Sequence, residues 1–270
     1  CYEWSANTPN GGDHNVYFRD GDAAELHRSS NWQAGGEPGE GTYPVEELYE
    51  RYEGRDDVLI IPHQGGRPAR LDALDPDLTP FVEILSVWGV FEWFGREALE
   101  RAPVGFVAGS DDHTGRPGAS HPTNAADWSF PVDGGLMAAR ADGLDRDSLW
   151  EAFRTRRVYG VTGDRILLEF TVNGAPMGSI IACDGPRRVS VRVSGSDALD
   201  RIELLRNGRV IATHCHQGTW RMPKADERCR FKLRVEAGWG PRPNEIGVPP
   251  RQWTGRLELD GGRFTGWEPC

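Results

Sequence analysis

The chain has 270 residues, and its 41 acidic side chains outnumber its 31 Lys and Arg side chains, which gives a net charge of −10. Its mean hydropathy is −0.56, and no apolar run approaches the roughly 18 residues that a membrane helix needs. The acidic balance argues against a nucleic-acid surface, which normally has a basic face. It agrees with the binding of divalent cations by clustered carboxylates.

The cysteines and the first residue give two further expectations. The five cysteines are scattered, so a disulfide framework is not expected, although a Cys215–Cys229 bridge across a hairpin stays open as an alternative. The chain begins at Cys1 within a strand-like segment, without a methionine or a visible signal peptide. We therefore expect it to lack its natural N-terminus, and no localisation follows from the sequence.

Strand-like and helix-like segments alternate through residues 1–163. Apolar runs predict strands at 16–18, 57–62, 81–87, 104–108 and 134–141. Apolar residues at helical spacing predict helices at 43–52, 92–102 and 146–157, the last capped by Asp145. This alternation predicts an α/β domain of parallel strands joined by crossover helices, with the active-site face of a (β/α) barrel.

The pattern changes at about residue 164. From there to residue 270, apolar and polar residues alternate in short segments separated by turn residues. The dipeptide Asn207-Gly208 predicts a tight hairpin, because both residues accept positive φ angles. Residues 164–270 are therefore predicted to form an antiparallel, immunoglobulin-like β-sandwich.

Polar residues stand at the ends of three predicted strands of the first domain. His63 follows 57–62, Asp111 and His113 follow 104–108, and Glu83 lies within 81–87. A neutral imidazole is a common ligand of zinc, iron or manganese, and residues two apart on an extended chain point the same way. The alternatives are a histidine that caps a strand end, and an Asx turn at the aspartates.

Other residues complete the candidate site. Glu3 could bridge two metal ions, and His14 could ligate one. Arg67 and Arg116 are candidates to bind a phosphate or carboxylate of the substrate. Glu83, Asp112 and His121 are weaker candidates, either orienting a ligand or belonging to strand ends and loops.

Four short phrases, "YEWS", "GGDHNVYF", "IPHQGG" and "GSDDH", resemble the PHP (polymerase and histidinol phosphatase) superfamily of metallohydrolases. Longer ones, such as "GFVAGSDDHTGRPG", are similar to its domain of unknown function 3604 family. The resemblance implies a distorted (β/α)7 barrel with two or three divalent metal ions, Zn, Mn or Fe. It implies that Glu3 is the bridging carboxylate, and that the remaining ligands are His14, His63, Asp111 and His113.

One departure from the superfamily is serious. Its members begin with a His-x-His strand upstream of the segment that matches Glu3, and this chain has no such pair. The chain therefore resembles the C-terminal portion of such a protein, and an incomplete metal centre is expected in it.

The function expected from the resemblance is metal-dependent hydrolysis of a small anionic substrate, a phosphoester, by a metal-activated water. Glu3, Asp111 and His113 would be the catalytic residues. The alternative, from a different class, is an inactive accessory or binding protein whose β-sandwich recognises a ligand.

Overall fold

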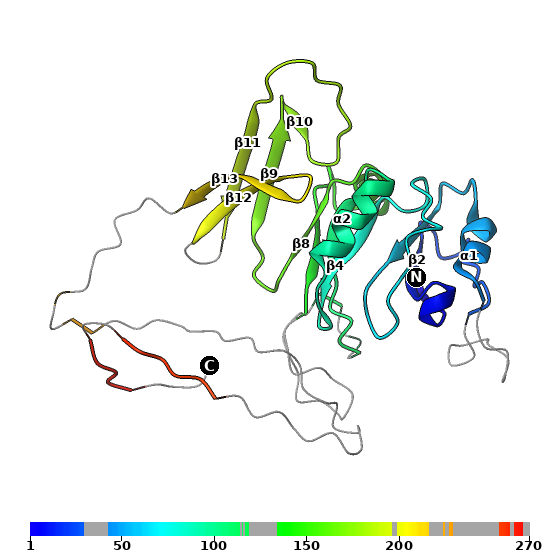
Figure 1. Cartoon of the computed structure of the whole chain (residues 1–270). Coiled ribbons are helices and arrows are strands. Elements are labelled where there is room, and N and C mark those ends of the chain that lie inside the picture. The colour runs from blue at the N-terminus through cyan, green and yellow to red at the C-terminus, as the bar shows by residue number, and fades with distance from the viewer. Residues whose placement is uncertain are drawn as a thin grey trace. The chain divides into compact units, whose positions relative to one another are not determined.

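Figure 1 shows the computed structural model of the chain, which describes most of the N-terminal part and shorter stretches of the C-terminal part. The described residues are 1–29, 43–113, 115, 117–118, 134–195, 199–215, 224, 227–228, 254–259 and 262–266. The chain divides into two compact units, Cys1–His214 and Cys215–Cys270. In the second unit, Arg256 and Glu258 form an ion pair at 2.7 Å.

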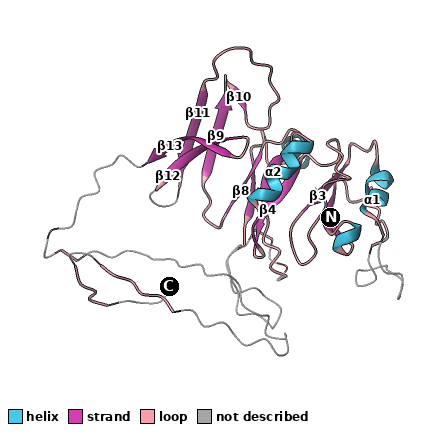
Figure 2. Cartoon of the chain, in the orientation of Figure 1, coloured by secondary structure: helices cyan, strands magenta, loops and turns pink. Residues whose placement is uncertain are grey.

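The first unit is rich in β-structure, as Figure 2 shows. Three short α-helices are found among the described residues: α1 (Val45–Tyr52), α2 (Glu92–Arg101) and α3 (Arg146–Arg154). The strands form several small sheets, and no closed barrel is present in the described ranges. The predicted α/β fold with a distorted (β/α)7 barrel is therefore wrong, because the described strands form small separate sheets that are mostly antiparallel.

The first sheet is built from β1 (Tyr2–Ser5), β2 (Asp13–Phe18) and β3 (Val58–Pro62), in that order. Both pairs are antiparallel, and a 3₁₀ helix at Thr8–Asn10 lies in the connection between β1 and β2. Helix α1 covers one face with the side chains that its helical spacing predicts, and these bury a core against the sheet. The core includes Val45, Leu48, Tyr49 and Tyr52 of the helix with Trp4, Val16 and Ile60 of the sheet.

The register of this sheet assigns each side chain to a face. Trp4 is aligned with His14, and His14 with Pro62. Because neighbouring residues of a strand point to opposite faces, Trp4 and His14 lie on the face covered by α1. Ser5 is aligned with Asp13, and these two residues share the opposite face with Glu3.

The second sheet has the order β5-β4-β6 and contains β4 (Phe81–Ser86), β5 (Gly89–Val90) and β6 (Gly105–Ala108). Strands β4 and β6 are parallel, and α2 is the crossover between them. Gly95 of this helix lies so close to Phe106 and Ile84 that a Cβ there would approach both within 3 Å. Here the predicted strand, helix, strand unit is confirmed.

The remaining strands of the first unit are antiparallel hairpins and a small sheet. Strands β7 (Leu136–Ala139) and β8 (Val158–Val161) pair around α3, whose first turn is capped by Asp145 through the Ser148 amide at 2.8 Å. A three-stranded sheet contains β9 (Leu167–Val172), β10 (Ala175–Pro176) and β11 (Val189–Ser194).

The last two strands in the described part of the chain form the predicted hairpin. They are β12 (Arg201–Arg206) and β13 (Arg209–Cys215). The turn residues Asn207 and Gly208 both have positive φ, 51° and 72°, as a tight hairpin turn requires. The boundary at 163/164 and the immunoglobulin-like sandwich stay predictions.

Two smaller points concern membrane segments and cysteines. No helix in the described ranges is both long and apolar enough to cross a bilayer. Cys1, Cys183 and Cys215 form no disulfide with one another, and Cys229, the partner considered for Cys215, lies outside the described residues.

Candidate functional site

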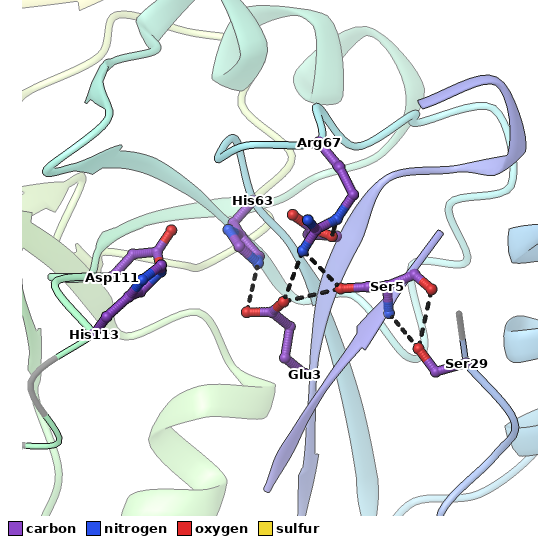
Figure 3. A network of polar contacts seen from close by, with 8 residues as sticks. Glu3, Ser5, Ser29, His63, Arg67, Asp111 and His113 are labelled. Atoms are coloured by element: carbon purple, nitrogen blue, oxygen red, sulfur yellow. Dashed lines mark hydrogen bonds and ion pairs between the residues drawn. The ribbon is translucent and has the colours of Figure 1, made fainter. Parts of the chain in front are cut away.

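The candidate site lies at one edge of the first sheet. His63 directly follows β3, and the antiparallel register places this end of β3 beside the first residues of β2. The end of β1 meets the same edge, because Ser5 is aligned with Asp13. Figure 3 shows the result: side chains from β1, from the turn after β3 and from the segment after β6 point toward one another.

Glu3 and His63 are the central pair of the site. Glu3 Oε2 is 3.9 Å from His63 Nε2, and the His63 side chain is only 3 % exposed. Neither ring nitrogen of His63 has a hydrogen-bond partner among the described residues. A buried polar atom without a partner costs about 1–3 kcal/mol, so this imidazole is a group for which a ligand would be favourable.

Asp111 and His113 approach the pair from the segment after β6. Asp111 Oδ1 is 3.1 Å from His113 Nε2. Asp111 Oδ2 and His63 Cε1 lie 3.1 Å and 3.5 Å from the position that a Cβ would take on Gly65. Asp111 and His113 have positive φ angles of 48° and 59°, so they do not form the extended pair that the sequence predicted. They are brought together by a turn instead.

Glu83 of β4 is a buried carboxyl group beside these residues. Its pKa is raised to about 7, chiefly by burial; Asp111 and Glu3 add to the rise, and His63 opposes it. A Cβ on Gly109 would collide with the Glu83 carboxylate, so the glycine after β6 is required for the close approach of the two strands. Glu83 therefore interacts electrostatically with Glu3, His63 and Asp111, which are three of the five predicted ligands.

Arg67 lies on the other side of Glu3. Its Nε donates to Asp13 Oδ1 at 2.7 Å, and its Nη2 lies 3.4 Å from Glu3 Oε1 and 3.2 Å from Ser5 Oγ. The guanidinium predicted to bind substrate thus contacts carboxylates of the protein itself. The sequence analysis missed Asp13 and Ser5; the signal available was that both share the face of Glu3 by strand alternation.

His14 is separated from this group by the sheet. It is fully buried and packs edge-on against Trp4 and Tyr49, with ring centroids 5.9 Å and 6.0 Å away. Its pKa is lowered to about 3, chiefly by burial and in part by the charge of the nearby His63. Its ring nitrogens also have no hydrogen-bond partner in the described ranges. The structure therefore does not place His14 among the side chains that gather around Glu3.

The predicted ligands do not form a ready coordination shell. Among the described residues, no group of three or more His, Cys, Asp and Glu side chains is arranged to hold a metal ion. Asp112 is nearly buried, 9 % exposed, beside the group. Arg116 and His121 lie outside the described residues. Glu3 lies beside His63, and Asp111 lies near Gly65 in the turn that follows His63. His113 contacts Asp111, and Glu83 interacts electrostatically with Glu3, His63 and Asp111.

Comparison with known proteins identifies relatives without a described role. No family model matches the chain, and no solved structure matches it. An uncharacterized protein of Chlamydia pneumoniae is 38% identical over 85 residues, 29% of this chain and 14% of that protein. An uncharacterized protein of Chlamydia muridarum is 36% identical over 90 residues, which are 31% of this chain and 14% of that protein.

A third relative, from Chlamydia trachomatis serovar D, matches over a longer stretch. It is also an uncharacterized protein, 26% identical over 201 residues, which are 63% of this chain and 32% of that protein. The chain thus spans about a third or less of the length of the curated relatives it matches.

Proposed function

We propose that the chain is part of a metal-dependent hydrolase whose metal ion binds beside His63 and Glu3. The observation that supports this most is the buried His63 imidazole, which has no hydrogen-bond partner among the described residues and faces Glu3 Oε2 at 3.9 Å. Imidazole nitrogen and carboxylate oxygen are the ligand atoms that zinc, manganese and iron share. A metal ion would give the imidazole the partner that the protein does not supply.

The donor set fits a metal ion in kind. Asp111 is the candidate for a further ligand, because its Oδ2 and the His63 ring both lie near the position that a Cβ would take on Gly65. His113 contacts the other oxygen of Asp111 and would orient this carboxylate. A bound divalent ion would lower the pKa of a coordinated water and so supply a nucleophile at neutral pH. Glu83, a buried carboxyl group that interacts with His63, Asp111 and Glu3, lies close to these ligands.

The substrate class in this proposal is a phosphoester. It is supported by the resemblance of "YEWS", "IPHQGG" and "GSDDH" to the PHP superfamily, and not by any group in the structure that selects phosphate. Because the chain covers only part of its relatives' length, the complete ligand set and the substrate both belong to the proposal.

The test is metal binding by the full chain, followed by hydrolysis. The protein is stripped with EDTA and titrated with Zn²⁺ and Mn²⁺ against a chromophoric chelator. The loaded protein is then assayed with p-nitrophenyl phosphate and bis(p-nitrophenyl) phosphate. We expect binding in the wild type and at least about a tenfold loss of affinity in His63→Gln, because a ligand is removed.

His27→Gln is the matched control. His27 is also a largely buried imidazole, with a side chain 17 % exposed, and its charge partner is Glu47. This variant should bind metal like the wild type. A wild-type chain that binds neither ion would contradict the proposal and favour the accessory role. Metal binding without phosphoester hydrolysis would retain the metal site and exclude these substrates.

A further inference from the structure

The turn after β3 is folded back tightly onto the start of β2. The Arg67 carbonyl accepts from the Asp13 amide at 3.1 Å, and the Arg70 amide donates to the Gly11 carbonyl at 2.9 Å. Gly12 has a φ of +74°, and a Cβ on it would collide with the Pro68 carbonyl. The backbone of Arg67 is therefore fixed relative to β2, and its side chain starts from a defined position.

From this position the guanidinium contacts two strands at once. The short contact is with Asp13 of β2, at 2.7 Å, and this carboxylate is 3 % exposed. The longer contact is with Glu3 Oε1 of β1, at 3.4 Å. A buried carboxylate needs a paired cation. Arg67 therefore pairs mainly with Asp13, and its longer contact with Glu3 is the weaker of the two.

Ser5 completes the arrangement around Glu3. Its hydroxyl donates to Glu3 Oε1 at 2.9 Å and also lies 3.2 Å from Arg67 Nη2. The backbone of Ser5 is fixed in turn by the Ser29 hydroxyl, which accepts from its amide at 2.8 Å and donates to its carbonyl at 3.0 Å. Glu3 Oε1 is thereby directed toward Arg67 and Ser5, and Oε2 toward His63 (Figure 3).

We propose that Arg67 is a positioning residue of the metal site, which holds Glu3 so that one oxygen, Oε2, is presented beside His63. The inference rests on the proposed function. It departs from the sequence prediction in two ways. Arg67 acts on a ligand instead of the substrate, and Glu3 binds through one oxygen instead of bridging two ions with both.

The first experiment measures Zn²⁺ affinity in the full chain by chelator competition. Removal of a group that orients a ligand typically costs about 10–100-fold in metal affinity, and we expect a loss of this size in Arg67→Met. Arg67→Lys keeps the charge without the planar fork, so it should recover part of the loss. Arg67→Lys also keeps the test decisive if Arg67→Met folds poorly.

Arg55→Met is the matched control. Arg55 is 28 % exposed and Arg67 32 %, and each pairs with an aspartate. Arg55 contacts Asp57 through both Nε and Nη2, at 2.8 Å and 2.6 Å, at the opposite end of β3 from His63. This variant should lose a similar ion pair and keep its Zn²⁺ affinity within about twofold of the wild type.

The second experiment needs no metal. The urea midpoints of Arg67→Met, Asp13→Asn and the double variant form a cycle in EDTA. If the ion pair of Arg67 with Asp13 holds Arg67 in place, each single change lowers the midpoint, and the double variant is no less stable than the less stable single variant. Additive shifts would mean that Arg67 and Asp13 do not act together and would overturn this part of the inference.

The outcomes separate this inference from the proposed function. Zn²⁺ binding that weakens in Arg67→Met and partly returns in Arg67→Lys supports both. Binding that is unchanged or tighter in Arg67→Met overturns the positioning role and leaves the metal site in place. A wild-type chain that binds no Zn²⁺ or Mn²⁺ overturns both.

Discussion

The sheet β1–β3 and the hairpin β12–β13 have the same kind of local sequence and opposite surroundings. All five residues of β3 are buried, whereas all seven residues of β13 are exposed. In the first sheet, α1 covers one face, the opposite side chains of β3 pack in a second cluster that includes Phe81, Val107 and Trp150, and buried polar groups collect at one edge. In the hairpin, Val210 and Ile211 are 52 % and 58 % exposed, although their sequence predicts a strand equally well.

This comparison shows that the tendency of a segment to form a strand does not determine whether that strand is buried. Alternation and a turn dipeptide are enough to form β12 and β13. A site such as that around His63 needs layers on both sides, because an unpartnered imidazole affects stability and chemistry only where water is excluded. The candidate chemistry is therefore found in the covered region, and four predictions test this contrast.

The largest expected effect compares the same substitution in both regions. Ile60 of β3 is 0 % exposed, and Ile211 of β13 is 58 % exposed. Ile60→Ala should cost about 2–5 kcal/mol of unfolding free energy, because it leaves a cavity under α1. Ile211→Ala should stay within about 0.5 kcal/mol of the wild type. Urea unfolding of both variants measures this, and equal losses would mean that β13 is covered in solution.

The next effect is the pH dependence caused by His14 in the covered region. Its pKa is lowered from 6.5 to about 3 by burial, so between these pH values the unfolded chain binds a proton that the folded chain does not. Stability from this group is therefore lost as pH falls below about 6.5. In EDTA, His14→Gln should lose less stability than the wild type between pH 7 and pH 5, by up to about 1.4 kcal/mol per pH unit.

Glu83 should act in the opposite direction. Its pKa is raised from 4.5 to about 7 by burial, so between these values the folded chain keeps a proton that the unfolded chain has lost. Its contribution is present at low pH and is lost as pH rises. Glu83→Gln should therefore make stability rise more steeply with pH than in the wild type. Unchanged pH profiles in both variants would contradict the burial of these two groups.

The smallest effect compares two tyrosine hydroxyl groups. Tyr49, 7 % exposed, shares a hydrogen bond with Thr79 Oγ1 at 3.0 Å, and Tyr49→Phe should cost about 1 kcal/mol. Tyr159 is less buried and donates to the Ile166 carbonyl at 2.9 Å at the start of β9. Tyr159→Phe should cost no more than about 0.5 kcal/mol, since water can replace its hydroxyl. Urea midpoints would show the reverse order if β9 were the better covered element.

Much of the secondary structure could be predicted from the sequence, but the pairing of the strands could not, and the predicted barrel is wrong. The strands 57–62, 81–87 and 104–108 and the three helices are found close to their predicted bounds, because apolar period and caps are local signals. Pairing direction is not local. The segment between β2 and β3 contains a helix, as a parallel crossover does, yet β3 returns antiparallel to β2.

The residue types of the candidate site could be predicted from the sequence, but the directions of their side chains could not. His63 and Asp111 follow strands, as their sequence positions predict, and Glu3 lies beside His63; their role as ligands stays a prediction. The face of His14 depends on its alignment with Trp4, and no composition or spacing contains that register. Arg67 was assigned to substrate for the same reason: its partner Asp13 is 54 positions away in the chain and is found only once β2 and β3 are paired.

The residues of the candidate site are far apart along the chain, so they are synthesised one after another and can fold in that order. Glu3, Asp13, His63 and Arg67 are joined within one sheet and its following turn. They leave the ribosome before Asp111, which waits for the β4–β6 pair. Because segments synthesised first can begin to fold first, the contacts of Arg67 with Asp13 and Glu3 can form before Asp111 reaches its place beside the turn after β3.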